Sequence, residues 1–319
     1  MDMRTPTGAF ARMACSLIIG ACLAFPLAAA AQDKPVKYTA TPLSGTVTLI
    51  QGSGGNVAVS SGEDGVYVID DQLQPIADQL MAEIRKISDR PVRFVINTHY
   101  HADHVGGNEA IGHTGAIIIA QDNVYKRMSS EQFSQFRNKT TDPWPLAALP
   151  VITFGDHITL HLNGEAVTAY HVAHAHTDGD SIIWFPVSNV IHMGDIYFNG
   201  LYPFIDLDGG GSLQGMLAGV EMALGIANED TRIIPGHGPL ASKADLAGYR
   251  DFLVKARDNV QALIDQGMSL KQAIAARPTA EWDQALGQTW ITPAQMVTFI
   301  YNSLKGIRQF TRTEANSSS

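Results

Sequence analysis

The sequence has only two cysteines in 319 residues, Cys15 and Cys22, and both lie in an apolar N-terminal stretch. Arg4 and Arg12 precede this stretch and alanines end it, so residues 1–31 are expected to be a cleaved secretory signal peptide. The mature chain would then work in the periplasm or outside the cell, without any thiol. This excludes disulfides as a source of stability and cysteine as a metal ligand.

A long hydrophobic run is also missing. The N-terminal run is too short, and too rich in alanine at its end, to predict a membrane span, so no stable membrane anchor is expected. The tetrapeptide IGAC at 19–22 faintly resembles a lipoprotein cleavage box. Because the apolar run continues beyond Cys22, cleavage near residue 31 is favoured and lipidation of Cys22 is the alternative.

Basic residues are few, with 22 Lys and Arg against 31 Asp and Glu. Without residues 1–31 these counts become 20 and 30, a net charge of −10. Nucleic-acid binding needs a basic surface, so nucleic acid is not expected as a partner. The remaining length suffices for one large domain, expected over 32–310, with a flexible tail at 311–319.

Strand and helix patterns alternate along the chain. Residues 45–70 combine β-rich runs with glycine turns and predict an antiparallel meander. Hydrophobic spacing predicts a helix over 74–87, and VRFVINT at 92–98 is typical of a buried strand. More strands are predicted at 156–173, 181–186, 190–195 and 231–235, and helices at 212–226, 242–266, 269–276 and 293–309. This order fits an α/β fold with two sheets back to back and helices outside.

One segment concentrates side chains that bind metals. NTHYHADHVGG, residues 97–107, places His99, His101, Asp103 and His104 within six positions. Such groups are costly to bury without partners, so the cluster indicates water or a metal. Positions i and i+2 of an extended chain point to one side, so His99 and His101 can reach one metal. The turn that follows can direct Asp103 and His104 to a second metal about 3.5 Å away.

Three later segments end in further candidate ligands. HAHTDGDS contains His176, IHMGDIYF contains Asp195 and IIPGHGP contains His237. Each follows a β-rich run and opens a loop, and loops at one edge of a scaffold are where sites are assembled. Nitrogen and oxygen donors without sulfur suit zinc, and could also suit iron or manganese.

The segments THYHADHVGG, HTDGDS, HMGDIYF and PGHGP resemble the metallo-β-lactamase superfamily, over about residues 40–240. The resemblance implies a four-layer αβ/βα sandwich with two zinc ions at the sheet edge. Helices at about 242–310 would be a C-terminal extension of it. By position, the ligands of one zinc match His99, His101 and His176. Those of the other match Asp103, His104 and His237. Asp195 matches the bridging carboxylate.

This arrangement implies hydrolysis of a small-molecule carbonyl substrate. Water held between two cations loses a proton near neutral pH, and the metals stabilise the anion that forms after attack. Asp103 is expected to be the catalytic carboxylate, binding metal and orienting the hydroxide. The complete set of candidate ligands argues against a binding module that has lost catalysis.

The substrate class is the next question. The export signal and the forms of NTHYHADHVGG and HTDGDSIIWFP favour β-lactams. Two departures argue against them: Asp195 stands where similar β-lactamases have a cysteine, and Phe198 where they have a lysine that holds the drug's carboxylate. Losing that cation removes a contact worth about 1.5–3 kcal/mol. We therefore expect β-lactam turnover to be weak or supported by another group.

Other activities stay open. Lactone, ester or thioester hydrolysis would use the same site. A persulfide dioxygenase or redox accessory protein would instead use one iron, so metal content discriminates between the classes.

Four further residues are candidates for the surroundings of the site. His174 could line the pocket, but a position behind a ligand or at the surface is favoured, and His192, in a strand, could hydrogen-bond behind a ligand. Tyr202 and Phe204 are predicted to form one wall of the substrate pocket, and TDPWPLAALP at 141–150 another.

Overall fold

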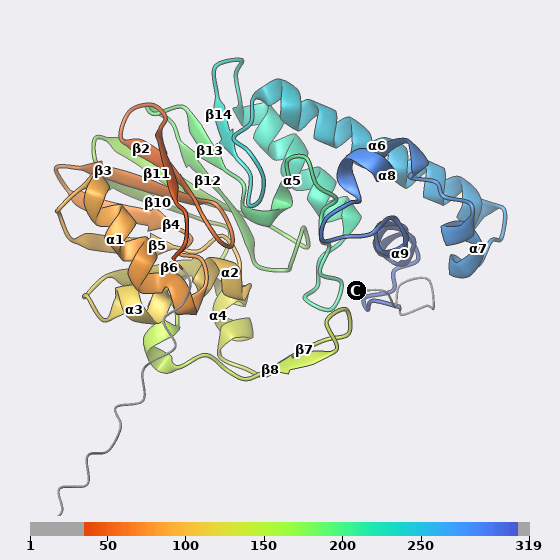
Figure 1. Ribbon diagram of the computed structural model, residues 1–319, viewed down its shortest axis with the longest axis horizontal. Coiled ribbons are helices and arrows are strands. Elements are labelled where there is room, and N and C mark those ends of the chain that lie inside the picture. The colour runs from red at the N-terminus through yellow and green to blue at the C-terminus, as the bar shows by residue number, and fades with distance from the viewer. Residues whose placement is uncertain (1–34, 312–319) are drawn as a thin grey trace, which may run out of the picture. The chain divides into compact units, whose positions relative to one another are not determined.

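The computed structural model describes residues 35–311. The expected signal peptide at 1–31 lies outside the described residues, as does the expected tail from residue 312 onward. Two large β-sheets dominate the described part, with helices on their outer faces (Figure 1).

The first sheet has seven strands in the order β1-β2-β3-β4-β5-β6-β9. Neighbours from β1 to β4 are antiparallel, which confirms the predicted meander, and β4, β5, β6 and β9 run parallel. The strands are β1 (Thr39–Pro42), β2 (Val47–Gln51), β3 (Val57–Gly62), β4 (Gly65–Ile69), β5 (Val92–Ile96), β6 (Ile117–Gln121) and β9 (Ile152–Phe154).

The second sheet has five strands in chain order, and only its last pair is parallel. They are β10 (His157–Leu162), β11 (Glu165–Val172), β12 (Asp180–Phe185), β13 (Val190–His192) and β14 (Arg232–Ile234). The strand predicted at 190–195 ends early because Gly194, with φ +50°, starts the 3-10 turn η3 (Gly194–Ile196).

Strand alternation produces the layers. In β4, Tyr67 and Ile69 pack toward the second sheet, and Val66 and Val68 pack toward α1 (Ala77–Ile87), which η1 (Gln74–Ile76) precedes. The short α3 (Asn108–Gly112) also covers the first sheet, whereas α5 (Leu213–Ile226) and α6 (Lys243–Asp265) cover the second. The predicted four-layer sandwich is confirmed.

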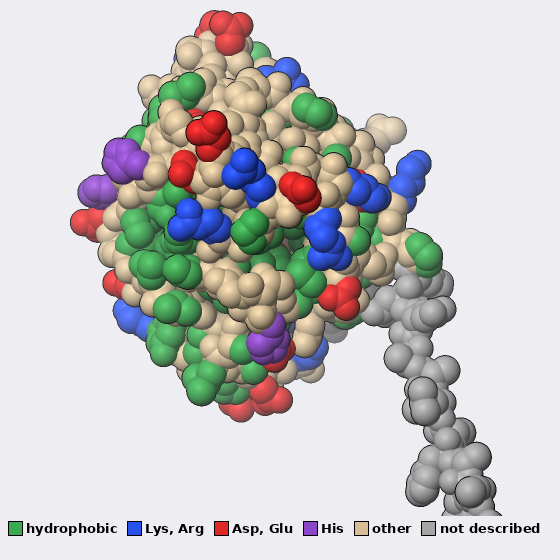
Figure 2. Space-filling model, turned by 90° about the vertical axis from the view of Figure 1, so that its left-hand side faces the viewer, with side chains coloured by type: hydrophobic (Ala, Val, Ile, Leu, Met, Phe, Trp, Pro, Cys, Tyr) green, Lys and Arg blue, Asp and Glu red, His purple; other side chains and the backbone are tan. Residues whose placement is uncertain are grey.

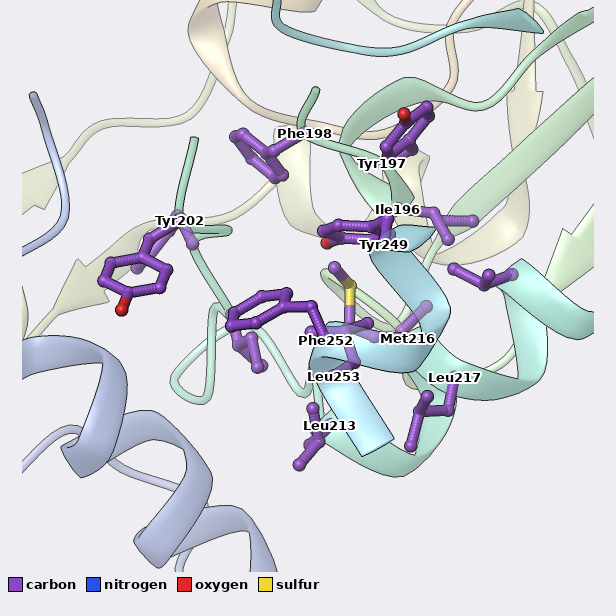
Figure 3. Packing of buried hydrophobic residues seen from close by; sticks show 14 of the residues in the cluster. Ile196, Tyr197, Phe198, Tyr202, Leu213, Met216, Leu217, Tyr249, Phe252 and Leu253 are labelled. Atoms are coloured by element: carbon purple, nitrogen blue, oxygen red, sulfur yellow. The ribbon is translucent and has the colours of Figure 1, made fainter. Parts of the chain in front are cut away.

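The C-terminal helices extend the layer formed by α5 and α6. They are α7 (Leu270–Ala275), α8 (Ala280–Leu286) and α9 (Pro293–Leu304). The sequence did not predict α8, and the helix expected to reach residue 309 ends at Leu304, before Gly306 at φ +67°. Figure 3 shows the aromatic and aliphatic side chains that join α6 to Tyr197 and its neighbours. Among residues 35–311, none of the helices is both long and apolar enough to cross a membrane.

A run of short elements, none of them predicted, surrounds the motif at 97–107. They are α2 (Ala102–Val105), α4 (Asp122–Met128), η2 (Leu146–Ala148) and the two-stranded hairpin of β7 (Gln132–Ser134) and β8 (Lys139–Thr141). β7 and β8 have three residues each, too few for an alternation of period two to be recognised in the sequence.

Large hydrophobic side chains remain exposed near β9, the edge strand of the first sheet. Figure 2 shows hydrophobic side chains gathered on one face of the molecule, with charged residues around them. The exposed residues on and near β9 include Ile117, Leu146, Val151 and Ile152. None of these four lines the cavities beside the candidate metal ligands.

Candidate metal centre

All seven candidate ligands follow the carboxyl ends of strands. In the first sheet, β5 ends at Ile96 and leads into the loop with His99 and His101; Asp103 and His104 follow in α2. The other three ligands come from the second sheet, since β11 leads to His176, β13 to Asp195 and β14 to His237. The fold thereby brings together all seven candidate ligands, in two adjacent groups.

The first group consists of His99, His101, His176 and Asp195, all of them buried. His176 Nε2 lies 2.8 Å from His101 Nδ1 and 3.5 Å from Asp195 Oδ2. His99 Nε2 lies 3.8 Å from the same carboxylate oxygen. One Asp195 oxygen thus faces the three imidazoles of this group.

The second group consists of Asp103, His104 and His237. His237 Nε2 lies 3.2 Å from Asp103 Oδ2 and 3.4 Å from His104 Nε2. The other oxygen of Asp195, Oδ1, lies 3.2 Å from His104 Nε2 and 3.5 Å from His237 Nε2. Asp195 therefore stands between the groups with one oxygen toward each, where a bridging ligand would stand.

Hydrogen bonds from outside the two groups orient the rings of the first. His176 Nδ1 donates to the carbonyl oxygen of Phe204 at 2.7 Å, and His101 Nε2 donates to Asp206 Oδ2 at 2.9 Å. His99 Nδ1 lies 3.1 Å from Thr98 Oγ1, whose own proton goes to Asp70. On His176 and His99 the hydrogen-bonded nitrogen is Nδ1, so Nε2 is the nitrogen that faces the centre.

These inward nitrogens are suited to hold a cation. His176 Nε2 and His101 Nδ1 face each other at 2.8 Å inside the first group. His99 Nε2 is buried without any hydrogen-bond partner. Buried polar atoms are costly to leave unpaired, and this donor set suits zinc, so the residues fit a metal.

The two groups hold protons differently. Burial lowers the pKa of His176 to about 4 and that of His99 well below its usual value, so both rings are neutral. Burial also disfavours the charged form of His237, but the carboxylates of Asp195 and Asp103 outweigh it and raise its pKa to about 9. His104 is raised well above its usual pKa, chiefly by Asp195 and Asp70 against burial. A metal entering the second group would therefore displace protons.

Two carboxylates outside the predicted set support the ligands. Asp70, directly after β4, accepts hydrogen bonds at 2.7 Å from His104 Nδ1, Thr98 N and Thr98 Oγ1. Asp206 accepts from His101 Nε2 and, at 2.7 Å, from the hydroxyl of Tyr100. Two features of the sequence could have pointed to these residues: Asp70 stands at a strand end, and Asp206 stands in a glycine-rich loop.

Asp206→Ala is expected to weaken zinc binding about tenfold to a hundredfold while the protein stays folded. The carboxylate holds the ring of His101 with its Nδ1 toward the first group, and losing such a partner has an effect of this size. Zinc affinity is measured by competition with a chromogenic chelator. Asp208→Ala is the matched control, because Asp208 accepts hydrogen bonds from the backbone of Gln135 instead. Equal affinity in Asp206→Ala and wild type would contradict this role.

The remaining predicted residues have different surroundings. His174, at φ +53°, is exposed and its Nδ1 donates to the carbonyl of Gly210, so the surface alternative holds. His192 is buried, donates from Nε2 to the carbonyl of Asn56 and accepts the Gly194 amide at Nδ1. It thus holds the backbone that carries Asp195.

The two residues of the expected aromatic wall have different surroundings. The hydroxyl of Tyr202 donates to Asp283 Oδ1 at 2.9 Å, so this side chain anchors α8. Phe204 does line a cavity together with His101, and its ring centroid lies 5.5 Å from that of His176. Residues 141–150 contribute Thr141, Asp142 and Trp144 to an adjoining cavity.

Trp290, which the sequence did not single out, also reaches the site. Its ring centroid lies 5.3 Å from that of Phe204 and 6.4 Å from those of His237 and Phe198. The C-terminal third therefore supplies an aromatic side chain beside the candidate ligands, in addition to thickening one layer.

Comparisons with known proteins agree with this architecture. A metallo-β-lactamase from Pontibacter korlensis has 17% identity and a TM-score of 0.56, covering 68% of this chain and 99% of its own. The DIM-1 metallo-β-lactamase has 17% identity and a TM-score of 0.55, and the match covers 69% of this chain and 99% of that protein. The sec-alkylsulfatase Pisa1 from a Pseudomonas species, at 16% identity and a TM-score of 0.63, covers 83% of this chain, which spans half of the sulfatase. The family model of the metallo-beta-lactamase superfamily matches residues 40–237. The chain belongs to the metallo-beta-lactamase superfamily.

Proposed function

We propose that the chain is an exported hydrolase that uses two zinc ions to open a small carbonyl substrate, with β-lactamase-like activity. The observation that carries this proposal is Asp195, which presents Oδ2 to one group of donors and Oδ1 to the other. When bound, two zinc ions would activate a water molecule and polarise a carbonyl group. The presence of a second group favours this reading over a dioxygenase with a single iron.

Asp103 is the residue best placed to act on the attacking water. Its side chain is 26% exposed, whereas that of Asp195 is 2% exposed, so Asp103 stands on the open side of the centre. Burial disfavours its charge, but His104 and His237 outweigh burial and lower its pKa, so the carboxylate stays ionised. It can accept a hydrogen bond from a water molecule and hold it in line with the substrate carbonyl.

The choice of substrate depends on the walls of the site. Phe198 stacks on His237, with ring centroids 5.4 Å apart and planes at 14°, so this position offers no cation to a β-lactam carboxylate. Lactones, esters and thioesters remain the next candidates. A sulfate ester is a further candidate, because the alkylsulfatase match covers more of the chain than residues 40–237 and so extends into the C-terminal helices.

Metal analysis combined with turnover tests this proposal. We expect the mature protein, with its N-terminus at Gln32, to occur in the periplasmic fraction with two zinc ions per chain. It should hydrolyse nitrocefin, a lactone, a thioester or an alkyl sulfate, lose this activity when a chelator is added and regain it with zinc.

Asp103→Ala should lower kcat by about 10²–10⁴-fold. Asp89→Ala, at an exposed carboxylate in the turn after α1, is the control. A single iron and no hydrolysis of any of these substrates would overturn the proposal.

A further inference from the structure

The β7–β8 hairpin is fixed beside the candidate centre. Asp208 Oδ2 accepts hydrogen bonds from the backbone amides of Gln135 at 2.7 Å and Phe136 at 3.4 Å, at the hairpin turn. The ring of Phe136 packs on Phe204 with centroids 4.9 Å apart and on Phe310 at 5.0 Å. The hairpin thus holds its next residue, Arg137, over the aromatic wall of the site.

Arg137 contacts two aromatic rings that border the candidate ligands. Its guanidinium carbon is 5.8 Å from the ring centroid of Phe204 and 5.8 Å from that of Trp290. Phe204 contacts the rings of the first group, and Trp290 contacts His237 of the second. Cation–π contact with two rings restricts the guanidinium while its N–H groups stay available to a ligand.

Three cations and two carboxylates of the described residues line the cavity, and of these cations only Arg127 forms an ion pair. Arg127 forms an ion pair with Asp178, Nη2 to Oδ2 at 2.7 Å. Asp206 is occupied by Tyr100 and His101, and Asp208 by the hairpin backbone. Within residues 35–311, Arg137 and Lys139 line the cavity with no carboxylate at ion-pair distance. In a chain of net charge −9, such a site attracts an anion.

From these contacts we propose that Arg137 binds an anionic group of the substrate, a carboxylate or a sulfate, and so sets the substrate class. The proposal rests on the hydrolytic function proposed above. Arg137 lines one cavity together with His101 of the first group and Phe204. The guanidinium fork matches an oxyanion with two parallel hydrogen bonds, and Phe204 and Trp290 would contact an apolar part beside it. Arg137 would supply the cation that Phe198 does not.

A matched pair of esters tests the proposal on the zinc-loaded protein. 4-Nitrophenyl hydrogen glutarate carries a carboxylate, whereas 4-nitrophenyl pentanoate has nearly the same length and no charge. Arg137→Ala should lower kcat/KM for the glutarate ester about tenfold to a hundredfold and leave the pentanoate ester within about twofold. Arg137→Lys should recover part of the loss, because the charge returns without the fork. Equal losses for both esters, or none, would overturn the role of Arg137.

Binding without turnover separates the failure of this proposal from that of the hydrolytic function. Calorimetry on wild type should show binding of 4-nitrobenzoate or 4-nitrobenzenesulfonate, but not of 4-nitrobenzamide, and Arg137→Ala should weaken it about tenfold or more. The two anions distinguish a carboxylate site from a sulfate site. Arg257→Ala, on α6, removes the same charge elsewhere and should change nothing. If anion binding depends on Arg137 but no substrate is hydrolysed, the anion-binding role of Arg137 stands and the hydrolytic function is rejected. If anions do not bind, or bind Arg137→Ala as well as wild type, the role of Arg137 is rejected.

Discussion

Asp195→Ala is expected to bind no more than one zinc ion per chain and to lose about 10²–10³-fold in kcat/KM. The side chain is 2% exposed, and each of its oxygens serves a different group of donors. Its removal takes a ligand from both groups and leaves the protonated forms of His104 and His237 without their main counter-charge. Losses of this size are typical when a group that stabilises transition-state charge is removed. Metal content by mass spectrometry and turnover on the same sample measure both effects.

Two other substitutions sharpen this result. Asp283→Ala removes a carboxylate that is also buried, but that one binds Tyr202 and Thr279 in the C-terminal helices. It should lower stability without changing zinc stoichiometry. Asp195→Cys places a thiolate where similar β-lactamases are expected to have one, and should keep zinc bound with reduced turnover. Two zinc ions and full turnover in Asp195→Ala would refute the bridging role.

The candidate ligands could be predicted because each is determined locally. His99 and His101 follow a buried strand at a spacing that fixes their direction, and His176, Asp195 and His237 each stand directly after a β-rich run. The sequence shows such strand ends clearly. β13 and β14 are parallel neighbours, and β11 runs in the same direction as β13 with β12 between them, so their carboxyl ends lie at one edge of the second sheet.

The surroundings of the site could not be predicted in the same way, because they depend on contacts between distant segments. Tyr202 and Phe204 are neighbours in one loop, yet Phe204 contacts His101 and Tyr202 binds Asp283, 81 positions along the chain. Arg137 and Trp290 meet across a hairpin and a helical extension that carry no metal motif. Hydrophobic periodicity reports which face of an element is buried, and it does not report which loops meet over a cavity.

Asp70 connects the fold to the centre, and Asp70→Ala is expected to lower the free energy of unfolding by about 3–5 kcal/mol. The carboxylate is fully buried and accepts hydrogen bonds from His104 Nδ1, Thr98 N and Thr98 Oγ1. Its loss leaves these donors unpartnered, and alanine tolerates the backbone φ of +61° less well than aspartate does. Urea unfolding with a chelator present measures this loss without any contribution from bound metal.

The same measurement with zinc separates the two roles of Asp70. Zinc that binds only the folded protein adds stability in proportion to the logarithm of its affinity. If Asp70 orients His104 toward the second group, the difference between Asp70→Ala and wild type must be larger with zinc than with chelator. Asp70→Asn keeps the tolerance for positive φ and one acceptor oxygen, so its loss with chelator should be smaller than that of alanine. An Asp70→Ala protein as stable as wild type would show that the hydrogen bonds to Thr98 and His104 do not hold this turn. If Asp70→Ala loses the same free energy of unfolding with and without zinc, Asp70 stabilises the fold but does not contribute to zinc binding by the second group.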